Sequence, residues 1–170
     1  MTGDTSYIAL LRAVNVGGSG KLPMADLRDL AEQAGFRQVS TYIASGNLLF
    51  ASEMNEKRVK KTIEDALESY AGSRIEVMVR TAAEMRKVEL DNPFREVAYN
   101  RIGVIFLDHP PPKSFEEKGV KNEVLKPGKR EIYVHYPDGM GRSKLKIPVA
   151  RFGTTRNMNT VTKLAGLASG

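Results

Sequence analysis

The sequence predicts an α+β protein with a ferredoxin-like N-terminal half and a second, smaller α+β half that ends in a C-terminal helix. Three observations lead to this fold class. Short apolar or alternating runs, typical of strands, recur through the first 80 residues. Two amphipathic segments separate them in the order strand, helix, strand, strand, helix, strand, which is the split βαβ pattern. The final segment carries an apolar stripe of helical spacing.

The first strand and the first helix flank a glycine-rich loop. Residues 7–14 read YIALLRAV, a short apolar run that predicts a buried strand. Apolar residues then recur at helical spacing over residues 24–34. Pro23 precedes this helix at a permitted position, and Gly35 provides a stop.

The remaining elements of the first half follow from turn signals and periodicity. Strands are predicted at residues 39–43 and 47–51, joined by the tight turn ASG. A helix over residues 59–70 ends at Gly72. In residues 74–80 apolar and charged residues alternate, which predicts a strand buried on one face.

The second half is less regular. We expect a helix at residues 82–88, a buried strand at 101–107, a helical turn at 115–119 and a strand at 129–136. A short helix should begin at Pro148 and end at Gly153, followed directly by the terminal helix. The predicted organisation is a ferredoxin-like domain at 1–80, a connecting segment at 81–98, and a second α+β subdomain at 99–170 with a basic C-terminal helix. No exact repeat is present, but the second half could be a degenerate echo of the first.

The composition excludes several classes of site. The chain has no cysteine, which removes disulfide scaffolds, thiolate zinc sites and cysteine nucleophiles. The two histidines, His109 and His135, have no carboxylates at ligand spacing, so we expect no metal and no cofactor. No apolar run approaches the length of a membrane span, and the N-terminus does not resemble a signal peptide. We therefore expect a cytoplasmic protein with no membrane partner.

The net charge of +6 is unevenly distributed. Residues 1–138 hold 20 basic and 20 acidic residues, whereas residues 139–170 hold six basic residues and no acidic one. A localised positive field favours an anionic partner: nucleic acid, a phosphorylated small molecule or acidic membrane lipid. The alternative is a basic tail that only aids solubility.

The segment TTRNMNT is the first candidate site. We expect the terminal helix to open here, with Thr154 or Thr155 as N-cap and Arg156, Asn157 and Asn159 in its first turn. Helix N-termini favour carboxylates, and this one carries an arginine instead. Amide groups, the positive dipole end and a guanidinium together predict an anion site. The alternative is that Arg156 pairs with an acidic residue elsewhere in the fold.

A second candidate is the loop RAVNVGGSGKLP. Its spacing differs from the phosphate-binding P-loop, which disfavours a nucleotide hydrolase. The loop could still present backbone amides and side chains to an anion, or could be a simple flexible connection. Arg12, at the end of an apolar strand, must be paired or point into a site. The candidate residues here are Arg12, Asn15, Gly17, Gly18 and Lys21.

Two further segments carry polar residues beside glycines. Ser45 and Asn47 could bind a ligand, but the chemistry of a tight turn also explains them. Ser143 and Lys146 have S-x-x-K spacing, yet the partner motifs of serine acyltransferases are absent. Binding of phosphate by Arg142, Ser143 and Lys144 is the better functional interpretation.

Several long motifs in order carry a resemblance to a known family. These are YIALLRAVNVGG, KLPMADLRDL, TYIASGNLLF, NPF, GRSKL and TTRNMNTVTKL, and the match as a whole spans about residues 7–167. The chain resembles the bacterial family called domain of unknown function 1697. The resemblance implies a small bacterial α+β protein and supplies no catalytic residues. Many relatives have tryptophan where this chain has Met158, and glycine where it has Ala13.

The sequence as a whole favours a protein that binds a phosphate-bearing ligand, either nucleic acid or nucleotide-like. Two alternatives stay open: an enzyme acting on a small phosphorylated or carboxylated substrate, and a protein-interaction module. The sequence leaves the oligomeric state undecided. It also leaves open whether the 15–21 loop and the 154–160 segment form one site.

Overall fold

A computed structural model describes residues 3–12, 22–151 and 153–169 of the chain. The chain divides into two compact units, residues 1–85 with 166–170, and residues 86–165. Within the described residues, no helix is long and apolar enough to cross a lipid bilayer. The sequence-based domain limits of 1–80, 81–98 and 99–170 stay a prediction about which parts fold independently.

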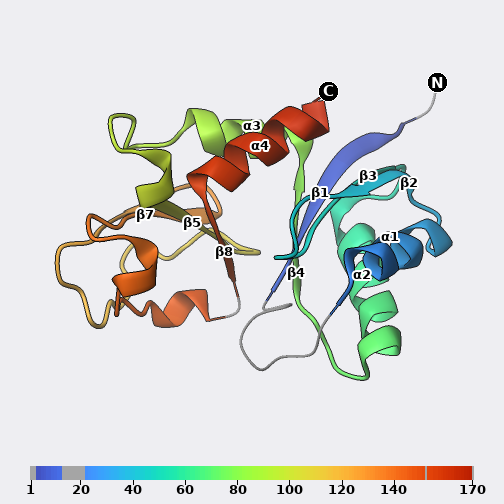
Figure 1. The fold of residues 1–170 in the computed structure, drawn as a ribbon, viewed down its shortest axis with the longest axis horizontal. Coiled ribbons are helices and arrows are strands. Elements are labelled where there is room, and N and C mark those ends of the chain that lie inside the picture. Colours follow the sequence, from blue (N-terminus) through green and yellow to red (C-terminus); the bar gives the residue numbers. More distant parts are fainter. Residues whose placement is uncertain (1–2, 13–21, 152, 170) are drawn as a thin grey trace. The chain divides into compact units, whose positions relative to one another are not determined.

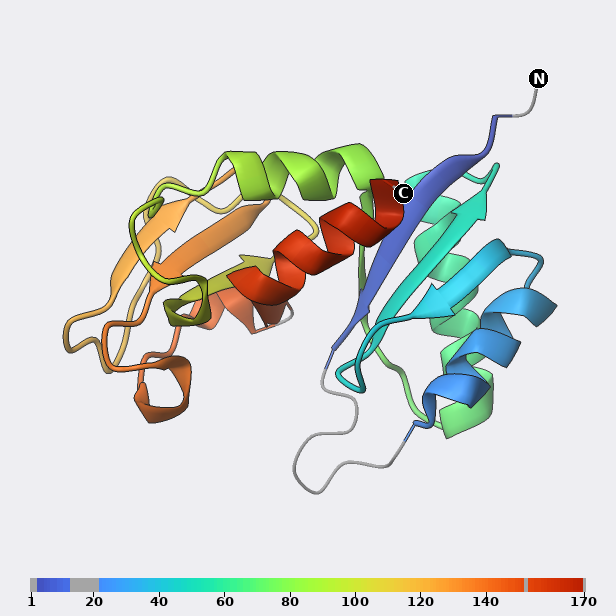
Figure 2. The same ribbon diagram turned by 45° about the horizontal axis from the view of Figure 1, so that its top comes forward.

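The first unit has the predicted ferredoxin-like order. Its four-stranded antiparallel sheet runs β2-β3-β1-β4, so each helix connects two parallel strands that are separated by one antiparallel strand. Figures 1 and 2 show the two helices side by side on one face of this sheet. The elements are β1 (Thr5–Leu11), α1 (Met24–Gln33), β2 (Arg37–Thr41), β3 (Asn47–Ser52), α2 (Glu56–Ala71) and β4 (Val77–Thr81).

The core of the first unit explains why these segments fold as they do. Leu27 and Ala31 of α1 and Ile63 and Leu67 of α2 are buried against the sheet face that includes Phe50. The apolar periodicity of each helix therefore matches the face it buries. Helix α2 begins after Asn55, whose side chain accepts a hydrogen bond from the Arg58 N–H, and ends at Gly72, which adopts a left-handed conformation (φ 77°).

Several details of the first unit differ from the sequence prediction. Strand β2 covers Arg37–Thr41 and not 39–43, and β4 begins at Val77 and not at residue 74. The first strand ends at Leu11, and Arg12 lies exposed in a bend; residues 13 and 14 of the predicted strand lie outside the described residues. Strand β4 is buried on both faces and not on one, since Met78 and Arg80 are only 2% and 1% exposed. Arg80 tolerates this burial in part because its Nη1 donates to the Val79 carbonyl oxygen at 3.0 Å.

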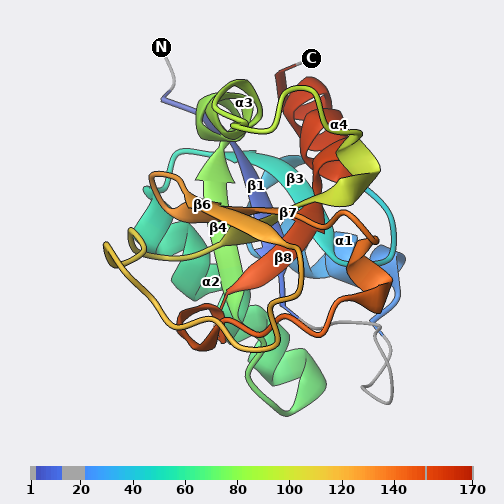
Figure 3. The same ribbon diagram turned by 90° about the vertical axis from the view of Figure 1, so that its left-hand side faces the viewer.

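The second unit repeats the strand order of the first. Its sheet runs β6-β7-β5-β8, and all neighbours are antiparallel (Figure 3). If β5 is matched to β1, β6 to β2, β7 to β3 and β8 to β4, the strand orders of the two sheets are identical. The elements from the linking helix onward are α3 (Ala82–Leu90), η1 (Tyr99–Arg101), β5 (Ile102–Phe106), β6 (Val124–Pro127), β7 (Glu131–His135), η2 (Met140–Arg142), η3 (Pro148–Ala150), β8 (Thr154–Asn157) and α4 (Met158–Ser169).

The two crossover connections of the second unit contain no α-helix among their described residues. Crossover 107–123 joins β5 to β6, and crossover 136–153 joins β7 to β8. Phe115 from the first and Leu145 and Ile147 from the second pack on the sheet face formed by Ile105, Ile132 and Val134. Loop residues and short 3₁₀ turns thus bury the face that two helices bury in the first unit.

Three predictions for the second half are corrected. Residues 115–119 form no helical turn, because Lys118 pairs with Lys146 through its backbone in an isolated bridge. Strand β6 was not predicted, since its exposed edge position leaves little apolar alternation in the sequence. Residues 154–157 form a strand and not the first turn of a helix.

Glu64 is a buried carboxylate that ties α2 to β4. It accepts hydrogen bonds from Lys60 Nζ at 2.8 Å, Arg74 Nη2 at 2.7 Å and the Val77 N–H at 3.0 Å. The substitution Glu64→Gln removes the charge that these donors contact. It should lower the free energy of unfolding by about 2 kcal/mol, because hydrogen bonds to charged groups contribute roughly 1.5–3 kcal/mol. Urea denaturation followed by circular dichroism measures this.

Asp65 provides the matched control on the same helix. It forms an exposed i,i+4 pair with Lys61 at 2.8 Å. Asp65→Asn should change stability by less than about 0.5 kcal/mol. Equal losses in the two variants would show that the buried contacts of Glu64 contribute nothing beyond an ordinary surface pair.

Candidate functional site

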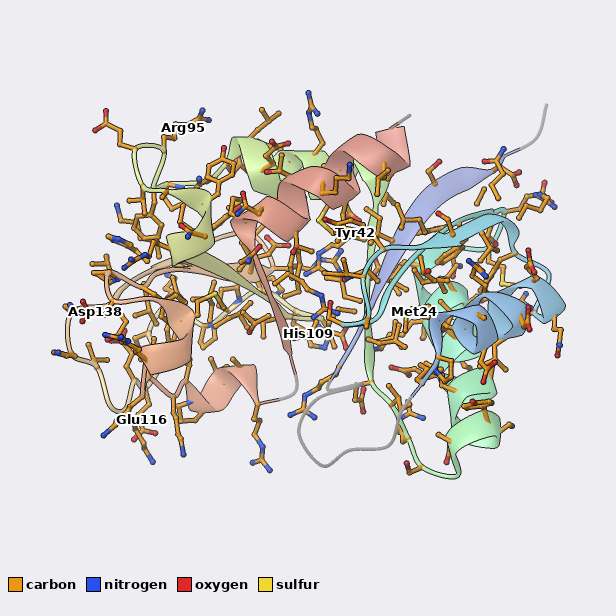
Figure 4. All side chains as sticks on the ribbon, viewed as in Figure 1. Met24, Tyr42, Arg95, His109, Glu116 and Asp138 are labelled. Atoms are coloured by element: carbon orange, nitrogen blue, oxygen red, sulfur yellow. The ribbon has the colours of Figure 1, made fainter. Side chains whose placement is uncertain are left out.

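A polar groove lies between the two crossovers of the second unit. It has a volume of about 430 Å³. One wall comes from crossover 107–123 and the other from crossover 136–153. Figure 4 labels one residue of each crossover, Glu116 and Asp138. The lining residues are Gly119, Lys121, Glu123, Asp138, Arg142, Ser143 and Lys144.

Backbone contacts hold the two walls close together. The Lys118 N–H donates to the Lys146 carbonyl oxygen at 2.8 Å, and the Lys146 N–H donates back at 2.7 Å. Gly119 follows with φ 71°, and a Cβ at this position would collide with the Lys144 carbonyl oxygen. Glycine is therefore required here both for its conformation and for the close approach of the opposite wall.

The hydroxyl of Ser143 connects the walls at the centre of the groove. Ser143 Oγ donates to Glu123 Oε2 at 2.6 Å and accepts from the Leu145 N–H at 3.1 Å. The other carboxylate oxygen of Glu123 accepts from the Lys121 N–H at 2.8 Å. The Ser143 hydrogen bond, aided by backbone N–H groups, lowers the pKa of Glu123 from 4.5 to about 2. Glu123 is thus ionised throughout the physiological range, with both oxygens engaged.

Asp138 makes a second connection across the groove. Its Oδ2 accepts from Asn122 Nδ2 at 3.0 Å and lies 3.7 Å from Lys121 Nζ. Within the described part of the chain, its Oδ1 has no hydrogen-bond partner. The sequence Pro137-Asp138-Gly139 places this carboxylate in a turn directly after β7, where Gly139 adopts φ 88°.

Two cations of the groove stand outside its ion pair. Arg142 and Lys144 flank Ser143 and are exposed. Over the ranges that the structure describes, neither forms an ion pair, whereas Lys121 pairs with Asp138. The lining holds three cations and the two carboxylates Glu123 and Asp138, a net charge of +1, and its two exposed cations without an ion pair lie beside a fixed network of hydrogen bonds.

The C-terminal candidate has a different structure from the predicted one. Residues Thr154–Asn157 form strand β8, which pairs with β5 in the register Val104 to Arg156, and helix α4 begins only at Met158. The prediction of Thr154 or Thr155 as N-cap is wrong. Asn157 caps the helix, since its Oδ1 accepts from the Thr160 N–H at 2.9 Å. The edge of β5 opposite β7 explains the difference, because it is available for pairing with residues 154–157. This pairing satisfies backbone groups that the first turn of a helix would leave without partners.

Arg156 lies on a buried face of the second sheet. It is 7% exposed, and its Nη1 donates to Thr154 Oγ1 at 2.8 Å and to the Thr155 carbonyl oxygen at 3.0 Å. Burial lowers its pKa to about 10, so the guanidinium stays charged at neutral pH. Thr155 and Asn159 are exposed. The structure therefore separates Arg156 from the exposed polar residues with which the sequence grouped it.

The N-terminal candidates are only partly described. Asn15, Gly17, Gly18 and Lys21 lie outside the described residues. Arg12 is exposed just after β1, and its backbone N–H donates to the Glu76 carbonyl oxygen at 3.0 Å.

Ser45 and Asn47 serve the turn between β2 and β3. The Asn47 side chain is fully buried, and its Nδ2 donates to the Tyr42 carbonyl oxygen at 2.8 Å and to Ser45 Oγ at 3.1 Å. Gly46 between them has φ 90°. These contacts favour the turn interpretation that the sequence left open.

The groove joins part of the predicted set with residues that the sequence did not reveal. Arg142, Ser143 and Lys144 all line the groove, whereas Lys146 is not among its lining residues and pairs through its backbone with Lys118. Lys121, Glu123 and Asp138 were missed. Of these three residues, only Asp138 has a recognisable local signal in the sequence, because it lies between Pro137 and Gly139 in a segment typical of a turn. The described residues hold no group of three or more metal-ligating side chains.

Comparisons with known proteins support the fold. The family described as "Protein of unknown function (DUF1697)" matches residues 5–133. No curated protein matches the chain. Among solved structures, the conserved bacterial protein SP0830 from Streptococcus pneumoniae is similar, with a TM-score of 0.77 and 24% sequence identity. That match covers 97% of this chain and 99% of the other.

The cap at Asn157 generates a testable prediction. Asn157→Ala should destabilise the protein by about 1 kcal/mol, because the side chain satisfies an N–H of the first helical turn. Asn157→Asp should retain the stability, since aspartate caps equally well and its charge suits the helix dipole. Thermal unfolding of the two variants measures this. A stable Asn157→Ala protein would contradict the assignment of this residue as the cap.

The Glu123 carboxyl should titrate with a midpoint near pH 2 in the folded protein. Its folded-state pKa is lowered, so its contribution to stability is complete above about pH 4.5 and is lost as the pH falls toward 2. NMR of the side-chain carboxyl carbon gives the midpoint. Ser143→Ala removes the main donor and should move the midpoint upward; an unchanged midpoint would show that the backbone donors alone suffice.

Proposed function

The chain belongs to the family of proteins of unknown function called DUF1697, and we propose that it binds a small phosphate-bearing ligand in the polar groove of its second unit. The observation that carries this proposal is the pair of exposed cations, Arg142 and Lys144, which have no carboxylate partner within the described residues. They lie on one wall of the groove, which hydrogen bonds already hold in place.

Charge supports a phosphate as the ligand. The second unit holds 16 Lys or Arg and nine Asp or Glu, so it carries the whole positive excess of the chain. Such a field raises the local concentration of anions. A phosphate monoester carries about −1.5 to −2 charges at neutral pH, so it can contact both exposed cations, Arg142 and Lys144, at once. An arginine can also contact phosphate oxygens with two parallel hydrogen bonds.

The volume of the groove and the negative charges of its two carboxylates favour a small molecule over a nucleic acid. The groove volume of about 430 Å³ lies within the range of small-molecule sites. Glu123 and Asp138 line the same groove. A polymer would bring several phosphates near these carboxylates, whereas a single phosphate can occupy the end beside Arg142 and Lys144. We therefore propose a phosphate monoester as the class of ligand.

Binding is a better proposal than catalysis at this site. The hydroxyl of Ser143 donates a hydrogen bond to Glu123, an arrangement that resembles a nucleophile and its base. The pKa of about 2 makes Glu123 a poor proton acceptor near neutral pH, where a general base works best with a pKa close to the ambient value. The pair instead acts as a structural link between the walls.

Titration of the full chain with methyl phosphate, followed by isothermal calorimetry or amide chemical shifts, tests the proposal. Wild-type protein should bind, and Arg142→Gln or Lys144→Gln should each weaken binding by about tenfold or more, because a charge-assisted hydrogen bond is lost. Raising the salt concentration should weaken binding as well.

Lys163→Gln is the matched control, since Lys163 is an exposed lysine of α4 that does not line the groove. It removes the same charge as Lys144→Gln and should leave the affinity nearly unchanged. Equal weakening by the two lysine variants would indicate a diffuse field effect and contradict a site in the groove. Absence of any binding would reject the proposed function.

A further inference from the structure

We infer that the ligand of the polar groove carries hydroxyl groups close to its phosphate, so that the site takes a sugar phosphate or the ribose phosphate of a nucleotide, with Asp138 as the residue that selects it. The inference rests on the proposed function. The observation specific to this inference is an oriented carboxylate oxygen, Asp138 Oδ1, that has no hydrogen-bond partner among the described residues.

The orientation of Asp138 is fixed from the opposite wall. Asn122 Nδ2 donates to Oδ2 at 3.0 Å, and Lys121 Nζ lies 3.7 Å from the same oxygen. Both neighbours engage Oδ2, which leaves Oδ1 as the acceptor available to a ligand. The carboxylate is about half exposed, so a ligand in the groove can reach it.

The two carboxylates of the groove differ in what they can offer. Glu123 accepts hydrogen bonds at both oxygens, from Ser143 and from the Lys121 N–H. Its negative charge is thereby dispersed over donors of the protein. Asp138 retains one acceptor, and an ionised carboxylate can only accept hydrogen bonds. A ligand that contacts Oδ1 must therefore supply a donor at that point.

A hydroxyl group is the donor that best satisfies this arrangement. A bare phosphate would gain from Arg142 and Lys144 but would be repelled by Asp138. A phosphate joined to a sugar places hydroxyl donors within a few ångströms of its anionic oxygens. Carboxylates of dinucleotide-binding folds recognise ribose hydroxyls in this way. The 430 Å³ groove accommodates such a molecule.

The test compares phosphate monoesters with and without a sugar, and two sugar phosphates that differ by one hydroxyl group. The full chain is titrated by calorimetry with methyl phosphate, ribose 5-phosphate and 2-deoxyribose 5-phosphate. Ribose 5-phosphate should bind about tenfold more tightly than methyl phosphate, since a hydrogen bond to a charged acceptor is gained. Equal affinity of wild-type protein for these two probes would overturn the inference while leaving the proposed phosphate site intact.

Asp138→Asn separates selectivity from phosphate binding. This variant should lose the preference for ribose 5-phosphate, while its affinity for methyl phosphate stays equal or rises because a repulsive charge is removed. Asp91→Asn is the matched control, since Asp91 is a half-exposed aspartate of the same unit that pairs with Lys87 and does not line the groove. A proportional loss of both probes in Asp138→Asn would contradict a selecting role.

Three further comparisons use the wild-type protein alone, so they do not depend on the Asp138→Asn variant. They also distinguish a free sugar phosphate from a nucleotide. A weaker affinity for 2-deoxyribose 5-phosphate than for ribose 5-phosphate in wild-type protein supports contact with a hydroxyl even if Asp138→Asn fails to fold. AMP that binds more tightly than ribose 5-phosphate points to a nucleotide, and AMP that binds no more tightly points to a free sugar phosphate. Binding of ribose without phosphate at equal affinity would overturn the inference.

Discussion

The connection of parallel strands across one antiparallel neighbour is the constraint on which the rest of this structure depends. In each sheet the first and second strands, and the third and fourth, are joined by crossovers that pass over the strand between them. Both crossovers of a unit then cover the same face of its sheet, as the packing of α1 with α2 and of Phe115 with Ile147 shows. Whatever the crossovers consist of, they must meet above that face.

The two units satisfy this constraint in different ways. In the first unit both crossovers are amphipathic helices, and their apolar stripes fill the space between them and the sheet. In the second unit the crossovers are loops with short 3₁₀ turns. A few apolar side chains bury the sheet face, and the polar remainder of the two loops meets further out. The groove is a direct consequence of replacing two helices with loops in the same topology.

Loops that meet without helical hydrogen bonding need other contacts to hold them. Here the Lys118–Lys146 backbone pair, the Ser143–Glu123 hydrogen bond and the Asn122–Asp138 hydrogen bond supply them. Each of these contacts consumes polar groups that would otherwise face solvent or a ligand. The groups that these contacts do not use are the cations Arg142 and Lys144 and the oxygen Asp138 Oδ1. These groups define the chemistry available to the groove. Structural contacts and ligand selectivity thus arise from the same residues.

The sequence by itself determined the elements whose signals are local. The fold class, the ferredoxin-like order of the first half, the C-terminal helix, the family and the grouping of Arg142, Ser143 and Lys144 could all be predicted, since periodicity, turn residues and neighbouring charges are properties of short segments. Only the tertiary structure decided the rest. Strand β8 exists because β5 offers it a partner, and this pairing removes Arg156 from the helix end and leaves Asn157 as the cap. Glu123 and Ser143 are 20 residues apart, and no local pattern predicts their hydrogen bond, because the topology of the sheet brings the two crossovers together.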